Sequence, residues 1–254
     1  MKNPGTLWYH KIRKEVSCLE KKILITGASH GIGKATAEVF GERGWKVYGC
    51  GSNREDRRGL EMEKAYRWFH FMYADVADSR DVERMLAWCR PLDAAFNNAG
   101  TGCVPRLPHE MDPDDARRVL EVNLLGTALC MKYECASMLE TGGVIINNSS
   151  VSAYKSTTGA DAVYSASKAG ILRLTAEAAA QKAYWGKIKF FSILPGWVET
   201  RMTAADDREA WEHRLPSERW NTPREVAELV FSIVAHQEAF ESGQEFQISG
   251  GGLL

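Results

Sequence analysis

The segment Lys22–Arg43, with the sequence KILITGASHGIGKATAEVFGER, decides the fold expected for this chain. The apolar residues Ile23–Ile25 predict a short buried strand, and Lys34–Arg43 predicts a helix. Thr26–Gly33, between them, is a glycine-rich turn. A strand, a glycine-rich turn and a helix in this order place a helix N-terminus where it can bind a phosphate group. The alternative interpretation is an ordinary strand-to-helix turn that binds nothing.

The three glycines of this turn have different expected roles. Gly27 permits the tight turn, Gly31 lets the backbone approach a ligand, and Gly33 lets the helix pack closely against the strand. Their spacing is Gly-x-x-x-Gly-x-Gly, which differs from the commoner Gly-x-Gly-x-x-Gly of dinucleotide-binding turns. The glycine spacing alone therefore does not identify a dinucleotide-binding turn, and other motifs must support that interpretation.

Strand-like and helix-like segments alternate through the rest of the chain. Further strands are predicted at 45–50, 68–74, 92–96, 143–148, 189–194 and 243–248, and helices at 79–90, 114–139, 161–183 and 223–236. Such alternation predicts an α/β fold, a three-layer, doubly wound parallel sheet of the Rossmann-like kind. Because no linker or composition break interrupts it, we expect one domain over residues 21–254, preceded by an N-terminal arm over residues 1–20.

The composition is that of an ordinary globular protein, with 254 residues, 44% hydrophobic and 26% charged, and a formal net charge of -1. A nearly neutral chain gives no reason to expect a nucleic acid or an anionic membrane as partner. No apolar run approaches the ~20 residues of a membrane-spanning helix, and residues 1–20 lack the apolar core of a signal peptide. The six cysteines are scattered, without zinc-ligand spacing. We therefore expect a cytoplasmic protein with reduced cysteines and no bound metal.

Polar or glycine-containing motifs directly follow most of the predicted strands. They are Asp75 after the third strand, Asn97–Gly100 after the fourth, Ser149–Ser150 after the fifth and Pro195–Thr200 after the sixth. In such sheets, ligands bind beyond the carboxyl ends of the strands. We therefore expect these motifs and the glycine-rich turn to meet at one edge of the sheet.

Tyr164 and Lys168 carry the expected chemistry. They lie in an Ala-rich segment without proline that predicts a helix, and a spacing of four residues places both side chains on one face. A phenol and an ammonium ordinarily lose their protons near pH ~10 and ~10.4. A nearby cation in a partly dry site makes the phenolate easier to form, so Tyr164 could give and take a proton near neutral pH. Alone, the pair also fits an ordinary helix surface.

Taken together, the motifs resemble those of the short-chain dehydrogenase/reductases, and most closely those of the 3-oxoacyl carrier-protein reductase-like members. The resemblance spans residues 22–252 and rests on Thr26–Gly33, Asn97–Gly100, Asn123, Ser150, Tyr164, Lys168 and Pro195–Gly196. It implies an oxidoreductase that transfers a hydride between a nicotinamide dinucleotide and a carbonyl or secondary alcohol substrate.

The resemblance also implies which residues bind the dinucleotide. The glycine-rich turn would cradle the pyrophosphate, Asp75 would meet the adenine amino group, and Lys168 would hydrogen-bond the nicotinamide ribose. The loop Pro195–Thr200 would contact the carboxamide. The full expected set is Gly27, Ser29, His30, Gly31, Ile32, Gly33, Ser52, Asn53, Arg54, Asp75, Val76, Asn98, Ala99, Gly100, Tyr164, Lys168, Pro195, Gly196, Val198 and Thr200.

Four residues have implied catalytic roles. Ser150 would position the substrate oxygen, Tyr164 would transfer the proton, and Lys168 would stabilise the phenolate. Asn123 would hold a water that links Lys168 to solvent, the alternative being an asparagine bonded to backbone in a kinked helix. One departure from the family pattern concerns the serine, which usually precedes the tyrosine by about thirteen residues and here precedes it by fourteen. We expect Ser149 and Ser152 to be loop hydroxyls.

The end of the second predicted strand bears on which dinucleotide binds. An acid there would favour NAD(H) by binding the ribose hydroxyls, but Cys50–Arg54 contains none. Ser52, Asn53 and Arg54 could accept a 2′-phosphate, and His30 occupies a family position where a basic residue often contacts the same phosphate. We therefore expect NADP(H), with NAD(H) as the alternative.

Two rival functions remain, a regulator that binds the dinucleotide without catalysis and a scaffold with a vestigial site. The retained Ser150, Tyr164 and Lys168 favour the enzyme. The expected partner is a small carbonyl or alcohol compound. By analogy with the family, helices 114–139 and 161–183 would form the interface of a homodimer or homotetramer.

Overall fold

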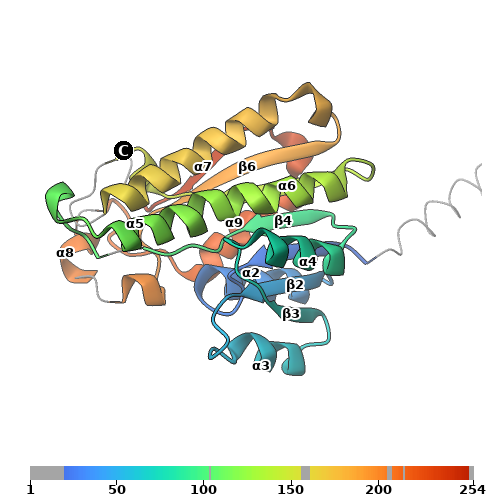
Figure 1. Ribbon diagram of the computed structural model, residues 1–254, viewed down its shortest axis with the longest axis horizontal. Coiled ribbons are helices and arrows are strands. Elements are labelled where there is room, and N and C mark those ends of the chain that lie inside the picture. The colour runs from blue at the N-terminus through green and yellow to red at the C-terminus, as the bar shows by residue number, and fades with distance from the viewer. Residues whose placement is uncertain (1–19, 103, 156–160, 205–207, 214, 252–254) are drawn as a thin grey trace, which may run out of the picture.

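A single parallel sheet organises the described part of the chain. The computed structural model describes residues 20–102, 104–155, 161–204, 208–213 and 215–251. Within these, seven strands pair in the order β3-β2-β1-β4-β5-β6-β7 (Figure 1). Their bounds are β1 (Lys22–Thr26), β2 (Lys46–Gly51), β3 (Phe69–Tyr73), β4 (Ala94–Asn97), β5 (Gly143–Asn148), β6 (Ile188–Pro195) and β7 (Glu245–Ile248). The predicted doubly wound α/β fold is confirmed.

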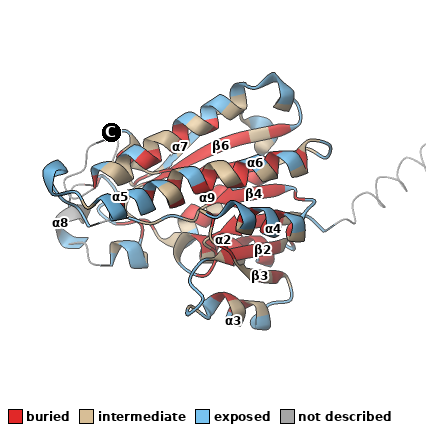
Figure 2. Ribbon diagram, in the orientation of Figure 1, coloured by how far each residue is buried: buried red, intermediate tan, exposed pale blue. Residues whose placement is uncertain are grey.

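Helices cover both faces of this sheet (Figure 1). The α-helices are α2 (Gly31–Glu42), α3 (Arg58–Ala65), α4 (Ser79–Cys89), α5 (Pro113–Leu120), α6 (Gly126–Met138), α7 (Ala162–Ala180), α8 (Arg208–Glu212) and α9 (Pro223–Ala235). Buried residues of α2, α3 and α9 pack in one apolar core, and those of α4 and α6 pack in another. A small third cluster joins α2 to α9 through Ala35, Val39 and Ala227. Phe190 and Phe191, neighbours on β6, belong to different cores, since successive strand residues point to opposite faces. Figure 2 shows the buried sheet between the two helix layers.

The helix predicted over 114–139 is interrupted by a π-helical turn, Glu121–Leu125, between α5 and α6. The start agrees with the prediction, because the Asp112 carboxylate accepts hydrogen bonds from the first backbone N–H groups of α5. The π turn contains Asn123, whose side chain bonds the backbone of Thr101 outside the helix. Such turns add one residue within an α-helix and occur often at functional sites.

The strand register aligns the carboxyl ends of the central strands. Thr26 at the end of β1 pairs with Cys50 of β2, and Asn97 at the end of β4 pairs with Asn147 of β5. The glycine-rich turn therefore lies beside the loops that follow β2, β4 and β5. In the part of the chain that the structure describes, no helix is long and apolar enough to cross a membrane.

Candidate active site

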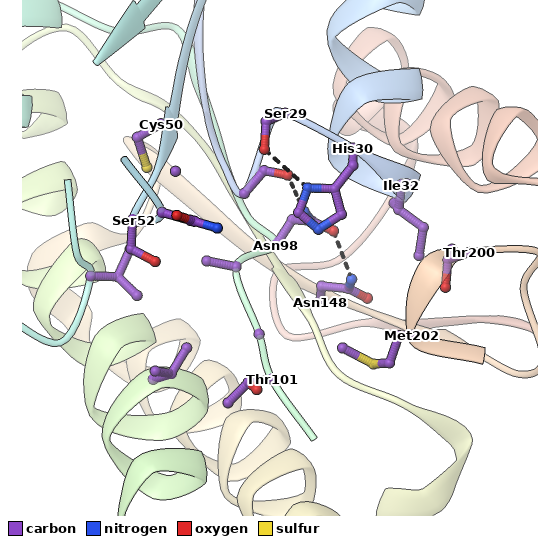
Figure 3. A pocket seen from close by; sticks show the side chains of 18 of the residues that line it. Ser29, His30, Ile32, Cys50, Ser52, Asn98, Thr101, Asn148, Thr200 and Met202 are labelled. Carbon is purple, nitrogen blue, oxygen red and sulfur yellow. Dashed lines mark hydrogen bonds between the residues drawn. The ribbon is translucent and has the colours of Figure 1, made fainter. Parts of the chain in front are cut away.

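A cleft of about 390 Å³ lies at the carboxyl edge of the sheet. Figure 3 shows part of it, with Ser29 and His30 from the glycine-rich turn on one side and Thr200 and Met202 on another. It brings together most of the residues expected there: Gly27, Ser29, His30, Gly31, Ile32, Ser52, Asn53, Asp75, Val76, Asn98, Ala99, Gly100, Ser150, Tyr164, Lys168, Pro195, Gly196, Val198 and Thr200. Gly33, Arg54 and Asn123 do not line it.

The glycine-rich turn has the backbone shape that a phosphate cradle needs. Gly27 and Gly31 have φ values of 67° and 55°, in the left-handed region where side chains are disfavoured. Gly33 lies behind the turn, because a Cβ there would lie 2.2 Å from the Gly27 carbonyl oxygen. Helix α2 begins at Gly31, so its first N–H groups and positive dipole end lie at the cleft. The turn therefore fits a pyrophosphate.

Asn98 ties this turn to the ends of β4 and β5. Its side-chain Nδ2 donates to the carbonyl oxygens of Thr26 and Gly27, at 2.9 and 3.3 Å. Asn148 donates to Asn98 Oδ1 at 3.0 Å (Figure 3). The Thr26 hydroxyl oxygen accepts from the backbone N–H groups of Asn98 and Ala99. These bonds fix the wall of the cleft before any ligand binds.

Tyr164, Lys168 and Ser150 meet at the other end of the cleft. Asp161 caps α7 by accepting from the N–H groups of Val163 and Tyr164, which sets where the helix begins. The Lys168 ammonium lies 5.6 Å from the centre of the Tyr164 ring and donates to the Asn148 carbonyl oxygen at 2.8 Å. Tyr164 forms a side-chain hydrogen bond with Ser150. The three side chains therefore lie together at one end of the cleft.

The expectation that Lys168 lowers the phenol pKa is wrong for this arrangement. Burial raises the pKa of Tyr164 above its ordinary value, and the hydrogen bond with Ser150 opposes that change. Burial also lowers the pKa of Lys168 to about 8. The reason is that a dry site penalises the charged form of both groups. Tyr164 is consequently protonated at neutral pH, which is the form that a proton donor needs.

The three neighbouring serines have different surroundings. The Ser149 hydroxyl donates to the Lys168 carbonyl oxygen at 2.8 Å, and the Ser152 hydroxyl donates to Ser150 Oγ at 3.0 Å. Ser149 is thus bonded to backbone, as expected of a loop hydroxyl, while Ser152 bonds a side chain. Ser150 Oγ also accepts from the Ser152 N–H, which fixes its position next to Tyr164.

Asn123 is fully buried behind the cleft. Its Oδ1 accepts from the Thr101 N–H at 2.8 Å, and its Nδ2 donates to the Thr101 carbonyl oxygen and to Ser167 Oγ. The side chain therefore braces the loop after β4, as in the alternative stated for an asparagine in a distorted helix. Its proposed link to a water remains a prediction.

The loop after β2 differs from the expectation. Arg54 does not line the cleft, because its guanidinium group lies over the ring of Tyr73, 5.7 Å from the ring centre. The cleft instead contains Asp56, which sequence reasoning missed. Asp56 accepts from the Ser29 hydroxyl at 3.3 Å and from Arg58 Nε at 2.8 Å. Hydrogen bonds from Arg58 hold the pKa of Asp56 at about 2, so the carboxylate is ionised.

His30 lies beside this carboxylate, with its Nδ1 at 3.9 Å from Asp56 Oδ2. Burial and the nearby Arg58 lower the pKa of His30, although Asp56 opposes them. His30 is therefore neutral at pH 7. Asp56 follows β2 by five residues, beyond the strand end where an acid that binds the ribose hydroxyls is expected.

A second missed residue is Arg118, which lines the cleft from α5. Its Nη2 donates to Asp75 Oδ2 at 3.0 Å. Of the charged side chains that line the cleft, Lys168 is the one beside Tyr164. Among the described residues, no group of three or more His, Cys, Asp or Glu could hold a metal ion.

Comparisons with known proteins agree with this geometry. The family model described as short chain dehydrogenase matches residues 21–211. The chain is 34% identical to cis-4-hydroxycyclohexanecarboxylate dehydrogenase of Sinomonas cyclohexanicum, over 91% of this chain and 96% of the relative.

Two solved structures are also similar. A 3-oxoacyl-[acyl-carrier protein] reductase from Brucella melitensis has a TM-score of 0.85 and 30% identity, over 92% of each chain. An actinorhodin polyketide ketoreductase solved with NADPH has a TM-score of 0.83 and 27% identity, over 92% of this chain and 97% of that one. The glycine-rich turn, the Ser150–Tyr164–Lys168 cluster and these similarities together assign the chain to the short-chain dehydrogenase/reductase family of oxidoreductases.

Proposed function

We propose that the protein transfers a hydride between NADP(H) and a carbonyl or secondary alcohol substrate. The observation that carries this proposal is the position of Ser150, Tyr164 and Lys168 in the same cleft as the glycine-rich turn. When bound, the dinucleotide supplies or accepts the hydride. By their names, the relatives act on a cyclic secondary alcohol and on 3-oxoacyl and polyketide groups. We extend to this chain only the chemistry that they share, which is the interconversion of a carbonyl and an alcohol.

The cleft residues would hold the dinucleotide along its length. The turn at Gly27 and Gly31 and the N-terminus of α2 would bind the pyrophosphate. Asp75 would accept a hydrogen bond from the adenine amino group, Lys168 would bind the nicotinamide ribose, and Pro195–Thr200 would contact the carboxamide. This placement is supported by the positions of all these groups around one cleft.

Three side chains would perform the proton chemistry. Ser150 would donate a hydrogen bond to the carbonyl oxygen, where negative charge develops during reduction. Tyr164 would deliver its proton to that oxygen, and the Lys168 ammonium would stabilise the resulting phenolate. In the oxidative direction the phenolate would take the alcohol proton back. The raised pKa of the Tyr164 phenol favours its role as the proton donor.

Replacement of the phenol hydroxyl tests this assignment. We expect Tyr164→Phe to bind the reduced dinucleotide like the wild type and to lose about 100-fold or more in kcat. The assay follows cofactor absorbance with a panel of ketones and alcohols. Tyr133→Phe, on α6 and hydrogen-bonded to Ser79, is the matched control and should retain activity. Unchanged turnover of Tyr164→Phe would refute the assignment, and wild-type binding without turnover on any substrate would favour a regulator.

The preference for NADP(H) rests on the charges around the loop after β2. Within residues 52–58, three arginines (Arg54, Arg57 and Arg58) and two acids (Glu55 and Asp56) leave one net positive charge. Ser52 and Asn53 supply polar groups at the cleft. Arg58 is half-exposed and could bind a 2′-phosphate in place of the carboxylate. A specific observation favours the alternative, NAD(H): the ionised Asp56 carboxylate lies in the cleft, where it could accept bonds from ribose hydroxyls.

Dissociation constants for NADPH and NADH decide between the two. Under the proposal the wild type binds NADPH more tightly, and Asp56→Asn increases that preference by about tenfold, because a negative charge is removed near the 2′-phosphate. Glu55→Gln, an exposed change in the same loop, should leave the ratio unchanged. Tighter binding of NADH by the wild type would establish the alternative.

A homodimer or homotetramer is also part of the proposal. Leu120 and Leu125, on α5 and the π turn, are 40% and 48% exposed. Large apolar side chains at the surface of adjacent helical turns favour association with a second copy.

A further inference from the structure

Arg118 and Asp75 form an ion pair inside the cleft, although 43 residues separate them in sequence. Arg118 extends from α5, and Asp75 follows β3. The Arg118 Nη2 lies 3.0 Å from Asp75 Oδ2, and both residues line the cleft. Val76 and Val122 line the cleft as well, so this end combines an ion pair with apolar walls. That combination suits a flat heterocycle with a polar edge.

Two other bonds fix Asp75. Its backbone N–H donates to Asp81 Oδ2 at 3.0 Å, and its Oδ1 accepts from the Ala77 N–H at 3.0 Å. Oδ2 is then oriented by Arg118. Each carboxylate oxygen can accept two hydrogen bonds, so Oδ1 and Oδ2 each retain capacity for one more donor.

We propose that Arg118 is a positioning residue for recognition of the adenine base. It holds the Asp75 carboxylate so that a remaining lone pair is available to the exocyclic amino group of the base. The inference rests on the proposed function, because it presupposes an adenine dinucleotide. It explains why a partly exposed arginine from α5 is placed beside the acid that follows β3.

The effect should be moderate and specific to the base. The Arg118 and Asp75 side chains are 47% and 33% exposed, so water screens part of their attraction. Pairs of this kind contribute little to stability, and loss of one corresponds to about a three- to fivefold change in an equilibrium constant. The change should appear in the ratio of the dissociation constants for two dinucleotides that differ in the base, because Arg118 orients the carboxylate that contacts the base.

The experiment compares two dinucleotides that differ only in the base. One is NADPH or NADH, whichever the wild type binds more tightly, and the other is the same cofactor with hypoxanthine in place of adenine. Hypoxanthine presents a carbonyl oxygen where adenine presents an amino group, so the Asp75 carboxylate should reject it. Dissociation constants are measured by fluorescence titration of the full chain.

We expect the wild type to bind the adenine form more tightly and Arg118→Gln to reduce this preference about three- to fivefold. Arg118→Lys should restore part of it. Arg117→Gln, which removes an exposed pair with Asp114 on the same helix, should leave it unchanged. In the background of Asp75→Asn, Arg118→Gln should have no further effect on the preference.

Three results would overturn the proposal. The first is an unchanged base preference in Arg118→Gln. The second is an equal loss of affinity for both dinucleotides, which marks a merely structural role. The third is an effect of Arg118→Gln on the base preference that adds to that of Asp75→Asn. A wild type that binds no dinucleotide would overturn the proposed function as well. If the wild type binds the adenine dinucleotide tightly and Arg118→Gln keeps the same base preference, only the inference about Arg118 fails.

Discussion

Glu134→Gln should change how the stability of the protein depends on pH. Glu134 lies on α6 and is fully buried between that helix and the sheet. Its Oε2 accepts from Asn97 Nδ2 at 2.9 Å, while its Oε1 has no hydrogen-bond partner among the residues that the structure describes. Burial raises the pKa of Glu134 to about 8, although the Asn97 hydrogen bond opposes this. The folded protein therefore keeps this carboxyl group protonated at neutral pH.

The sign and size of the effect follow from the two pKa values. The ordinary value is 4.5 and the folded value is about 8. Between them the folded protein holds a proton that the unfolded chain has released, so the free energy of unfolding falls as pH rises. The slope is about 1.4 kcal/mol per pH unit, or about 3 kcal/mol between pH 5 and pH 7.5. Below pH 4.5 Glu134 is protonated in both the folded and the unfolded protein, so it no longer makes the free energy of unfolding depend on pH.

The glutamine side chain has the shape of the neutral acid and cannot ionise. We therefore expect Glu134→Gln to equal the wild type within about 1 kcal/mol at pH 5 and to exceed it by about 3 kcal/mol at pH 7.5. Urea unfolding at the two pH values, at equal protein concentration, measures the difference. Glu140→Gln, an exposed change just beyond the same helix, should follow the wild type at both.

Parallel stabilities of the wild type and Glu134→Gln across this pH range would refute the reasoning. They would mean that the carboxyl group titrates near its ordinary pKa. A variant much less stable than the wild type at pH 7.5 would show that Glu134 is ionised in the fold and paired with a cation.

Three further predictions concern the cleft and the surface. Lys168→Met should lose turnover yet raise the free energy of unfolding at pH 7 by about 2 kcal/mol, because burial lowers the lysine pKa to about 8. Below pH 8 the folded protein bears the full cost of keeping this ammonium charged, and that cost exceeds the value of the lost bond to Asn148. A urea midpoint equal to or below that of the wild type would contradict this. Gly33→Ala should abolish dinucleotide binding in a fluorescence titration, because its Cβ would lie 2.2 Å from the Gly27 oxygen. Gly102→Ala should bind normally, because among the described residues its Cβ would meet no atom within 4 Å beyond its own chain neighbours. Leu125→Glu should sediment as a 28.3 kDa monomer, while Leu107→Glu, at another exposed site, should sediment like the wild type.

Much of the fold could be predicted from the sequence because its signals are local. Apolar runs marked the strands, and Asp112, Asp161 and Thr222 cap the helices that follow them. The strand at 143–148 was predicted with its observed bounds. The motifs after the strands were predicted to share one edge, since parallel strands end together, and most of their residues line one cleft.

The remaining features depend on contacts between distant residues. Arg118 enters the cleft because the π turn and α5 pack near the end of β3, which no local pattern indicates. Asp56 enters it because its loop folds back toward the glycine-rich turn, where Ser29 donates to it. A four-residue spacing indicates that Lys168 lies near Tyr164 but not how completely the phenol is buried, and burial raises the pKa of the phenol.

The π turn at Glu121–Leu125 gives the two parts of one long helix separate rotational phases. An α-helix advances by about 100° per residue, so one additional residue rotates every later side chain by about that angle. Arg118 can thus serve the cleft while Glu134 faces the sheet. A chain shortened by one residue in this turn could satisfy one of these orientations but not both, which makes insertions and deletions here far less tolerable than substitutions.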